Sequence, residues 1–119
     1  MKPAGRADQA FDPQGEDPPQ ESRRHARRRI SVPIEFALGD KERRAGICRD
    51  IGLGGMHVDT AEPAPFGSSV IIFVRLPGME NEAALPGIVR WTGPGCMGIQ
   101  LGSYGARVTH AIIRILSDP

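Results

Sequence analysis

Two short segments of the chain combine residue types that recognise nucleotides. Five arginines occupy seven positions in Arg23-Arg24-His25-Ala26-Arg27-Arg28-Arg29, and a carboxylate precedes a glycine turn in Asp50-Ile51-Gly52-Leu53-Gly54-Gly55. A guanidinium pairs bidentately with phosphate and with the O6 and N7 acceptors of guanine. A carboxylate can accept hydrogen bonds from the N1–H and N2–H₂ groups of guanine. Because about one β-hairpin of sequence separates the segments, a sheet can bring them together, and the pair would suit a guanine dinucleotide.

Residues of the second segment, and one tryptophan later in the chain, have both a binding and a purely structural interpretation. Asp50 either accepts from a guanine or satisfies backbone N–H groups as an ordinary turn residue. Gly54 and Gly55 are expected to adopt positive φ in a tight turn, and Gly55 also allows a base to approach the backbone. Trp91, the only tryptophan, either stacks on a guanine or serves as a core or rim aromatic.

The elements that must position these residues follow from hydrophobic periodicity. Short apolar alternations separated by turn residues predict six strands, over 31–38, 42–51, 56–60, 70–76, 84–91 and 97–101. The fourth is apolar on both faces, so we expect it to be covered on both sides. Val108, Ala111, Ile112 and Ile115 recur at helical spacing. The chain is therefore predicted to be mainly β, a six-stranded antiparallel barrel with a C-terminal α-helix.

Composition divides the 119 residues into a leader and one domain. Residues 1–21 contain four prolines, five carboxylates against two cations, and Phe11 as their one large aromatic side chain. Such a segment cannot bury enough apolar surface to offset its ordering entropy, so 1–21 is predicted to be a disordered leader. Residues 22–117 are predicted to be the folded domain.

The bulk charge and apolar content exclude several classes of protein. The net charge is only +1, which argues against a general nucleic-acid binder, so no DNA or RNA partner is expected. No apolar run is long enough to span a membrane and no signal peptide is present, so the cytoplasm is the expected location. Cys48 and Cys96 lack a Cys-x-x-Cys spacing and are expected to be buried free thiols.

The layout of these motifs resembles the PilZ domain family. Arg23 and Arg27 match the family's Arg-x-x-x-Arg motif before the first strand, although Arg24 and Arg28 satisfy the same spacing. Residues 50–55 are similar to the family's Asp/Asn-x-Ser-x-x-Gly motif between the second and third strands. Residues 87–91 and 98–101 also look like the family's fifth and sixth strands. The resemblance runs from about residue 23 to residue 116.

The resemblance implies a receptor for the bacterial second messenger cyclic di-GMP. Arg23 and Arg27 would contact phosphate and guanine, and Arg24 and Arg28 would be neighbours that set how many ligand copies bind. The free arginine segment, residues 22–29, is expected to be flexible and to close over the barrel on binding. Gly52 stands where the family has serine, and the lost hydrogen bond is worth about 0.5–1.5 kcal/mol, a several-fold to tenfold loss of affinity.

The ligand-binding set expected from residues and resemblance together is Arg23, Arg24, Arg27, Arg28, Asp50, Gly52, Gly55 and Trp91. No catalytic motif is present, and no His or Cys cluster has metal-ligand spacing, so we expect neither an enzyme nor a metal or cofactor. Output would pass through a partner protein, with the receptor a monomer or weak dimer. Two other interpretations stay open: a degenerate PilZ adaptor that binds proteins without nucleotide, and a barrel that binds nucleic acid through its arginines.

Overall fold

The computed structural model describes residues 26–117. The predictions for the leader, residues 1–21, and for Arg23 and Arg24 fall outside this range. Within it the chain forms six strands and one helix: β2 (Arg27–Ala37), β3 (Arg44–Gly52), β4 (Gly55–Asp59), β5 (Ser69–Val74), β6 (Ala83–Gly93), β7 (Cys96–Leu101) and α3 (Ala106–Ser117).

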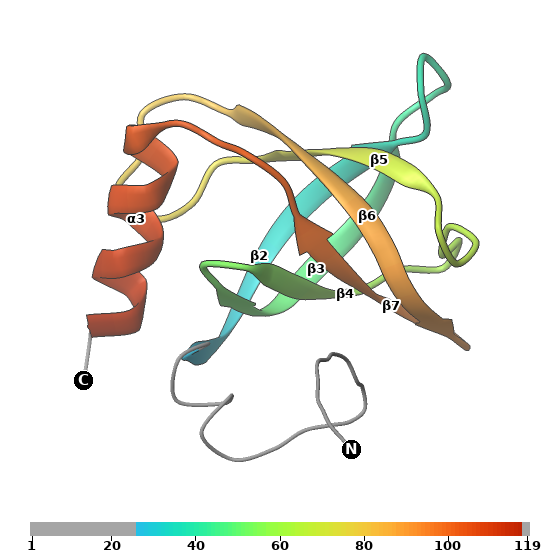
Figure 1. Ribbon diagram of the computed structural model, residues 1–119, viewed down its shortest axis with the longest axis horizontal. Helices are drawn as coiled ribbons and strands as arrows, with labels where there is room; N and C mark the ends of the chain where they lie inside the picture. The colour runs from blue at the N-terminus through green and yellow to red at the C-terminus, as the bar shows by residue number, and fades with distance from the viewer. Residues whose placement is uncertain (1–25, 118–119) are drawn as a thin grey trace, which may run out of the picture.

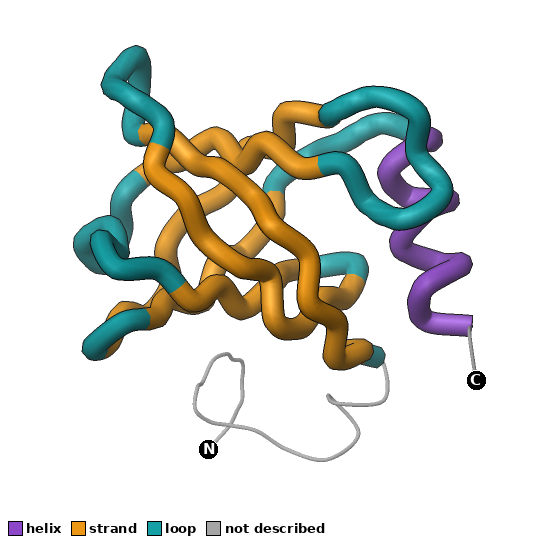
Figure 2. Tube along the Cα trace, turned by 180° about the vertical axis from the view of Figure 1, so that it is seen from behind, coloured by secondary structure: helices purple, strands orange, loops and turns teal. Residues whose placement is uncertain are grey.

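The six strands close into one antiparallel barrel. Their order around the barrel is β2-β3-β4-β7-β6-β5, and β5 pairs with β2 to complete the ring. Figure 1 and, from behind, Figure 2 show the strands wrapped into a barrel with α3 standing beside one end. The predicted fold class, a six-stranded antiparallel barrel with a C-terminal helix, is confirmed.

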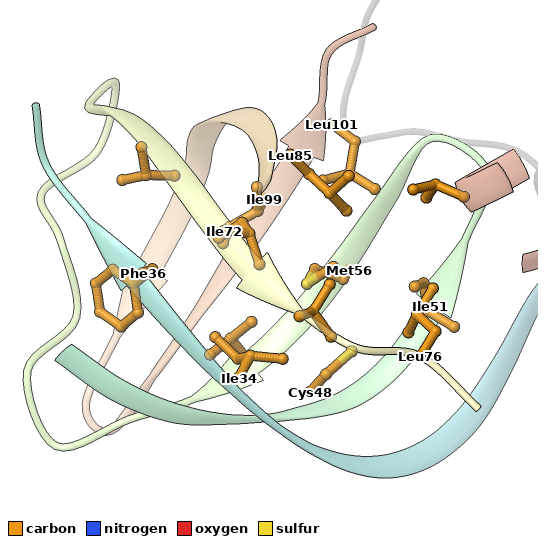
Figure 3. Close-up of a cluster of buried hydrophobic side chains, with 14 of the residues drawn as sticks. Ile34, Phe36, Cys48, Ile51, Met56, Ile72, Leu76, Leu85, Ile99 and Leu101 are labelled. Atoms are coloured by element: carbon orange, nitrogen blue, oxygen red, sulfur yellow. The ribbon is translucent and has the colours of Figure 1, made fainter. Parts of the chain in front are cut away.

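Alternating side chains fill the barrel and exclude water from it. Phe36, Ile51, Ile72 and Val89 are fully buried, each from a different strand, and Figure 3 shows part of this cluster. Each such side chain contributes about 1.5–3 kcal/mol by leaving water. In the described residues, no helix is long and apolar enough to cross a bilayer.

The helix adds its apolar stripe to the same core. Val108, Ala111 and Ile112 are buried, at the spacing that predicted the helix, and Ile115 packs against the cluster. Because α3 lies against the β2 and β3 side of the barrel, it covers an end that the strands alone would leave open.

The prediction that the fourth strand is covered on both faces is wrong. In β5 only every second side chain is buried, and Ile71 and Phe73 on the other face are half-buried. A closed barrel has a filled inside and a solvated outside, so apolar residues on the outer face must find local cover. For Phe73 this cover is the guanidinium of Arg43, whose central carbon lies 3.6 Å from the ring centre.

Both cysteines are free thiols, as predicted, but they differ in burial. Cys48 is fully buried, and desolvation raises the pKa of its thiol to about 12. Cys96 is only half-buried, because it lies at the start of β7, directly after the turn that joins β6 to β7. The expectation that both thiols are buried is therefore wrong for Cys96.

Candidate functional site

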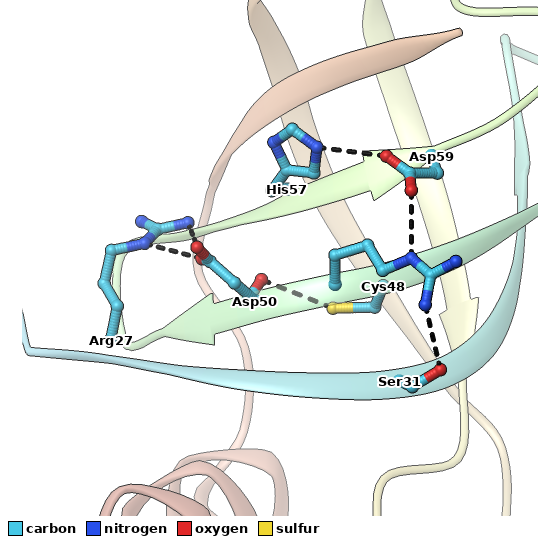
Figure 4. Close-up of polar contacts among 7 residues, drawn as sticks. Arg27, Ser31, Cys48, Asp50, His57 and Asp59 are labelled. Carbon is cyan, nitrogen blue, oxygen red and sulfur yellow. Dashed lines mark hydrogen bonds and ion pairs between the residues drawn. The ribbon is translucent and has the colours of Figure 1, made fainter.

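The barrel brings the arginine segment and the glycine turn together through an ion pair. Arg27 Nε donates to Asp50 Oδ1 at 2.7 Å, and Arg27 Nη2 contacts the same carboxylate. The antiparallel register of β2 and β3 places Arg27 opposite Gly52 and Arg29 opposite Asp50. Figure 4 shows the Arg27 guanidinium reaching across to Asp50. Both side chains remain partly exposed, at 43 and 33 %, so a ligand can reach them.

The first strand begins earlier than the pattern predicted, at Arg27 rather than Ser31. Residues 27–29 are therefore already paired with β3, and the expectation that they are flexible without ligand is wrong. Alternation along β2 exposes Arg27 and Arg29 on the outer face and turns Arg28 toward the other side. Of the two registers of the Arg-x-x-x-Arg motif, the one containing Arg27 thus lies beside Asp50.

Gly52 and Gly55 are needed for close backbone approach. A Cβ at Gly52 would lie 2.5 Å from the carbonyl oxygen of Ala26, and one at Gly55 would lie 2.5 Å from that of Ile99. The prediction of positive φ at Gly54 and Gly55 is wrong, since φ at both lies outside that region. Glycine at position 52 instead lets the start of β2 lie against β3, in the space that the family's serine would need.

The turn that carries these glycines is anchored to the neighbouring chain. The Leu101 amide donates to the Gly54 carbonyl at 2.9 Å, and the Tyr104 hydroxyl donates to the Leu53 carbonyl. Burial raises the pKa of Tyr104, so its hydroxyl stays protonated as a donor near neutral pH. These two bonds fix the turn beside Asp50 without help from a ligand.

A β-bulge in β3 aims two consecutive side chains at the outer face. Cys48 pairs with Val58 and Asp50 pairs with His57, so Arg49 is an extra residue on its strand. Such an insertion breaks the alternation of the strand and re-aims the side chain. Arg49 is exposed and Asp50 half-exposed, while Cys48 still points into the core.

A second bulge does the same in β6. Val89 pairs with Ile99 and Trp91 pairs with Gly98, which leaves Arg90 as the extra residue. Arg90 and Trp91 both face outward. The indole lies flat over Gly98, where a Cβ would meet its Nε1 atom, and it remains 46 % exposed. Trp91 is thus a surface aromatic and not a core residue.

The two bulges complete a row of outward residues that crosses five strands, which we call the cross-strand row. It runs Arg29, Asp50, His57, Gly98, Trp91, each residue paired in register with the next. The His57 and Trp91 rings are 5.2 Å apart and tilted by 47°. The row therefore places cation, carboxylate and aromatic groups side by side on one exterior face.

A hollow of about 390 Å³ lies over the tryptophan end of this row. Its polar and aromatic lining includes Arg27, Asp50, His57, Arg90 and Trp91. Arginine forks can pair with phosphate or with the guanine acceptor edge, and the indole face can stack on a base. The hollow thus combines groups that can pair with an anion and groups that can stack on an aromatic ring.

Of the residues predicted to bind ligand, the structure gathers Arg27, Asp50, Gly55 and Trp91 around one hollow and places Gly52 beneath the start of β2. It does not bring Arg28 to this face. His57 and Arg90, which line the hollow, were not predicted. The alternation of His57 with the apolar Met56 and Val58 is the signal that places His57 outward. Nothing in the sequence marks the bulge that turns Trp91 to the same face as Arg90.

Comparisons with known proteins agree with the fold and the motifs. The family model described as PilZ domain matches residues 21–117. The structure is similar to the PilZ domain of CeSA from a cellulose-synthesizing bacterium, with 25 % identity and a TM-score of 0.61 over 76 % of this chain and 93 % of that one. It is also similar in fold to the Bacillus subtilis inhibitor of motility MotI/DgrA, with 21 % identity and a TM-score of 0.63 over 83 % of this chain and 54 % of that one. No curated protein matches the chain. Since the family model spans most of the sequence and the barrel carries the matching motifs, the chain belongs to the PilZ domain family.

Proposed function

We propose that this PilZ domain is a cytoplasmic receptor for cyclic di-GMP that signals through a partner protein. The observation that carries the proposal is the Arg27–Asp50 pair beside the exposed indole of Trp91, in one hollow. Such a site binds a ligand by charge and stacking, and the proposal includes no catalytic step.

The contacts of the free protein suggest how the ligand is accommodated. Arg27 Nε and Nη2 are directed at Asp50, so a guanine that donates to Asp50 must share or replace this ion pair. The released guanidinium can then turn to phosphate, for which its fork is suited. Because the pair is exposed, it is worth less than about 1 kcal/mol, and exchanging it for ligand contacts costs little.

Residues upstream of the barrel complete the proposal. Since residues 27–29 already belong to β2, we propose that ligand contacts fix only the preceding residues, including Arg23 and Arg24, over the hollow. The changed surface is then what the partner protein reads. Hydrogen exchange across residues 20–30 tests this step, and no added protection of residues 22–26 with saturating ligand would contradict it.

The direct test is calorimetric titration of cyclic di-GMP into the protein and into an Arg23→Ala/Arg27→Ala variant. We expect saturable binding that is lost in the variant and absent with GTP and cyclic di-AMP. Circular dichroism of the variant controls for folding. No heat from the folded wild-type protein at high ligand concentration would refute the proposed receptor.

The second candidate function is a degenerate adaptor that binds a protein without nucleotide. Gly52 favours it, because the Ala26 carbonyl occupies the space above that glycine where the family motif has a serine. Asp50 is also already paired with Arg27. The absence of nucleotide binding in the titration, together with an intact fold, would select this function over the first.

A further inference from the structure

A second arginine–carboxylate pair lies beside the first on the same outer face. Arg49 Nε donates to Asp59 Oδ2 at 2.9 Å, and Arg49 Nη1 donates to the Ser31 hydroxyl at 3.2 Å. The guanidinium is therefore held from two sides while its side chain stays 49 % exposed. Arg49 follows the buried Cys48 and faces outward by regular alternation, and the bulge in β3 keeps Asp50 on the same outer face beside it.

This pair borders a hollow of about 560 Å³, distinct from the one at the tryptophan end of the cross-strand row. The two hollows share Asp50 and His57, which form the ridge between them. The hollow at the arginine end of the row is lined by Arg29, Ile30, Arg49, Asp50, His57 and Asp59. The outer face therefore has two adjoining depressions, each with its own arginine–aspartate pair.

Histidine joins the second pair to the aromatic end of the cross-strand row. His57 Nε2 lies 3.1 Å from Asp59 Oδ1, a contact that is marked by a dashed line in Figure 4. The ring of His57 also packs on Trp91. The hydrogen bond from Arg49, with a further one from His57, lowers the pKa of Asp59. Asp59 is therefore a permanent acceptor at neutral pH, and it lies directly beside a permanent donor.

A guanine base matches such a pair through its two edges. Its O6 and N7 atoms accept from an arginine fork, and its N1–H and N2–H₂ groups donate to a carboxylate. Adenine has a donor where guanine has O6, so it cannot satisfy the same fork. A cyclic di-GMP molecule has two guanines, and the Arg27–Asp50 pair takes only one of them.

We propose that the hollow at Arg49 and Asp59 is a second base subsite, which receives the other guanine of the cyclic dinucleotide. The inference rests on the proposed function and extends it to Arg49 and Asp59, which belong to neither sequence motif. It makes Arg49 a specificity-determining residue, because it reads the acceptor edge that distinguishes guanine from adenine.

The test compares Arg49→Ala with Arg43→Ala by calorimetry against cyclic di-GMP and cyclic GMP–AMP. Arg43 is a matched control, since it is a half-exposed arginine on the β2–β3 hairpin with its own carboxylate partners, Glu35 and Glu82. We expect Arg49→Ala to weaken cyclic di-GMP binding by about tenfold or more, the value of charged hydrogen bonds. Its effect on cyclic GMP–AMP, whose adenine can occupy the hollow, should be under about threefold, and Arg43→Ala should change neither by more than about twofold.

The outcomes separate this inference from the proposed function. If the wild-type protein binds cyclic di-GMP and Arg49→Ala binds it with the same affinity, the second subsite is overturned and the proposed receptor stands. The subsite is also overturned if Arg49→Ala loses as much affinity for cyclic GMP–AMP as for cyclic di-GMP, or if Arg43→Ala loses as much affinity for cyclic di-GMP as Arg49→Ala does. Neither result would reflect the reading of a guanine edge by Arg49. No binding by the folded wild-type protein would overturn the receptor and the subsite together.

Discussion

Gly52 and Gly55 lie equally close to the backbone of a neighbouring segment, yet the structure predicts different consequences for replacing them. A Cβ at either position would lie 2.5 Å from a carbonyl oxygen, that of Ala26 or that of Ile99. This is closer than real Cβ atoms come, so the backbone must move. Ala26 immediately precedes β2, whereas Ile99 lies inside β7, which is paired with β4 on one side and β6 on the other.

The difference in freedom to move sets the magnitudes. In Gly55→Ala the closed barrel cannot relax, and overpacking of this kind costs about 1–3 kcal/mol. For a domain of this size each kcal/mol lowers Tm by about 4–8 °C, so we expect a loss between about 4 and about 24 °C. In Gly52→Ala the start of β2 can lift away, so Tm should fall by less than about 4 °C, while Arg27 is displaced from Asp50.

Thermal unfolding followed by circular dichroism measures the first effect, and hydrogen exchange of residues 26–29 measures the second. We expect exchange in this segment to rise several-fold in Gly52→Ala and to stay near wild type in Gly55→Ala. The reasoning is refuted if Tm falls by the same amount in the two variants, or if residues 26–29 are as protected from exchange in Gly52→Ala as in the wild-type protein.

Three further measurements test the packing and the electrostatics. Phe36 is fully buried and Phe66 is 68 % exposed, so Phe36→Ala should cost about 3–5 kcal/mol in denaturant unfolding and Phe66→Ala less than about 0.5 kcal/mol. At about pH 8 a thiol reagent should label Cys96 and leave Cys48 unmodified, because the raised pKa and burial of Cys48 deny the reagent a thiolate; labelling of both in the folded protein would contradict this. The folded pKa of Asp59 is lowered below its unfolded value of about 3.9, so its stabilising contribution is present above about pH 4 and is lost as the pH falls through the folded pKa. When the pH is lowered from about 6 to about 3, Tm should accordingly fall less in Asp59→Asn than in the wild-type protein. An equal fall in Tm would show that Asp59 does not contribute to the pH dependence of stability.

Hydrophobic periodicity was enough to predict the elements of this fold. Alternation along residues 31–38 identified the first strand, and the spacing of Val108, Ala111 and Ile112 identified the helix, because burial on one face imposes a period on any sequence that forms such an element. The period says nothing about how far an element continues into polar sequence. The extension of β2 back to Arg27 therefore became visible only in its pairing with β3.

The meeting of Arg27 with Asp50 was also accessible from the sequence. Neighbouring strands joined by a short hairpin are nearly always antiparallel partners, so residues at similar distances from the hairpin must lie opposite each other. The partial exposure of the outer face of β5 could not be predicted in the same way. An apolar face suggests burial under another element, and only the structure shows that Arg43 covers Phe73 instead.

What the sequence by itself determined, then, is the number and order of the strands, the helix, and the neighbourhood of the first arginine–aspartate pair. These are properties of local pattern and short-range connection. The tertiary structure alone decided the cross-strand row, because His57 meets Trp91 only through closure of β4 against β7 and β7 against β6. It also decided that Asp50 and Trp91 face outward beside Arg49 and Arg90, because the inserted residue of each bulge reverses the face that alternation from Cys48 and Val89 assigns to the next side chain.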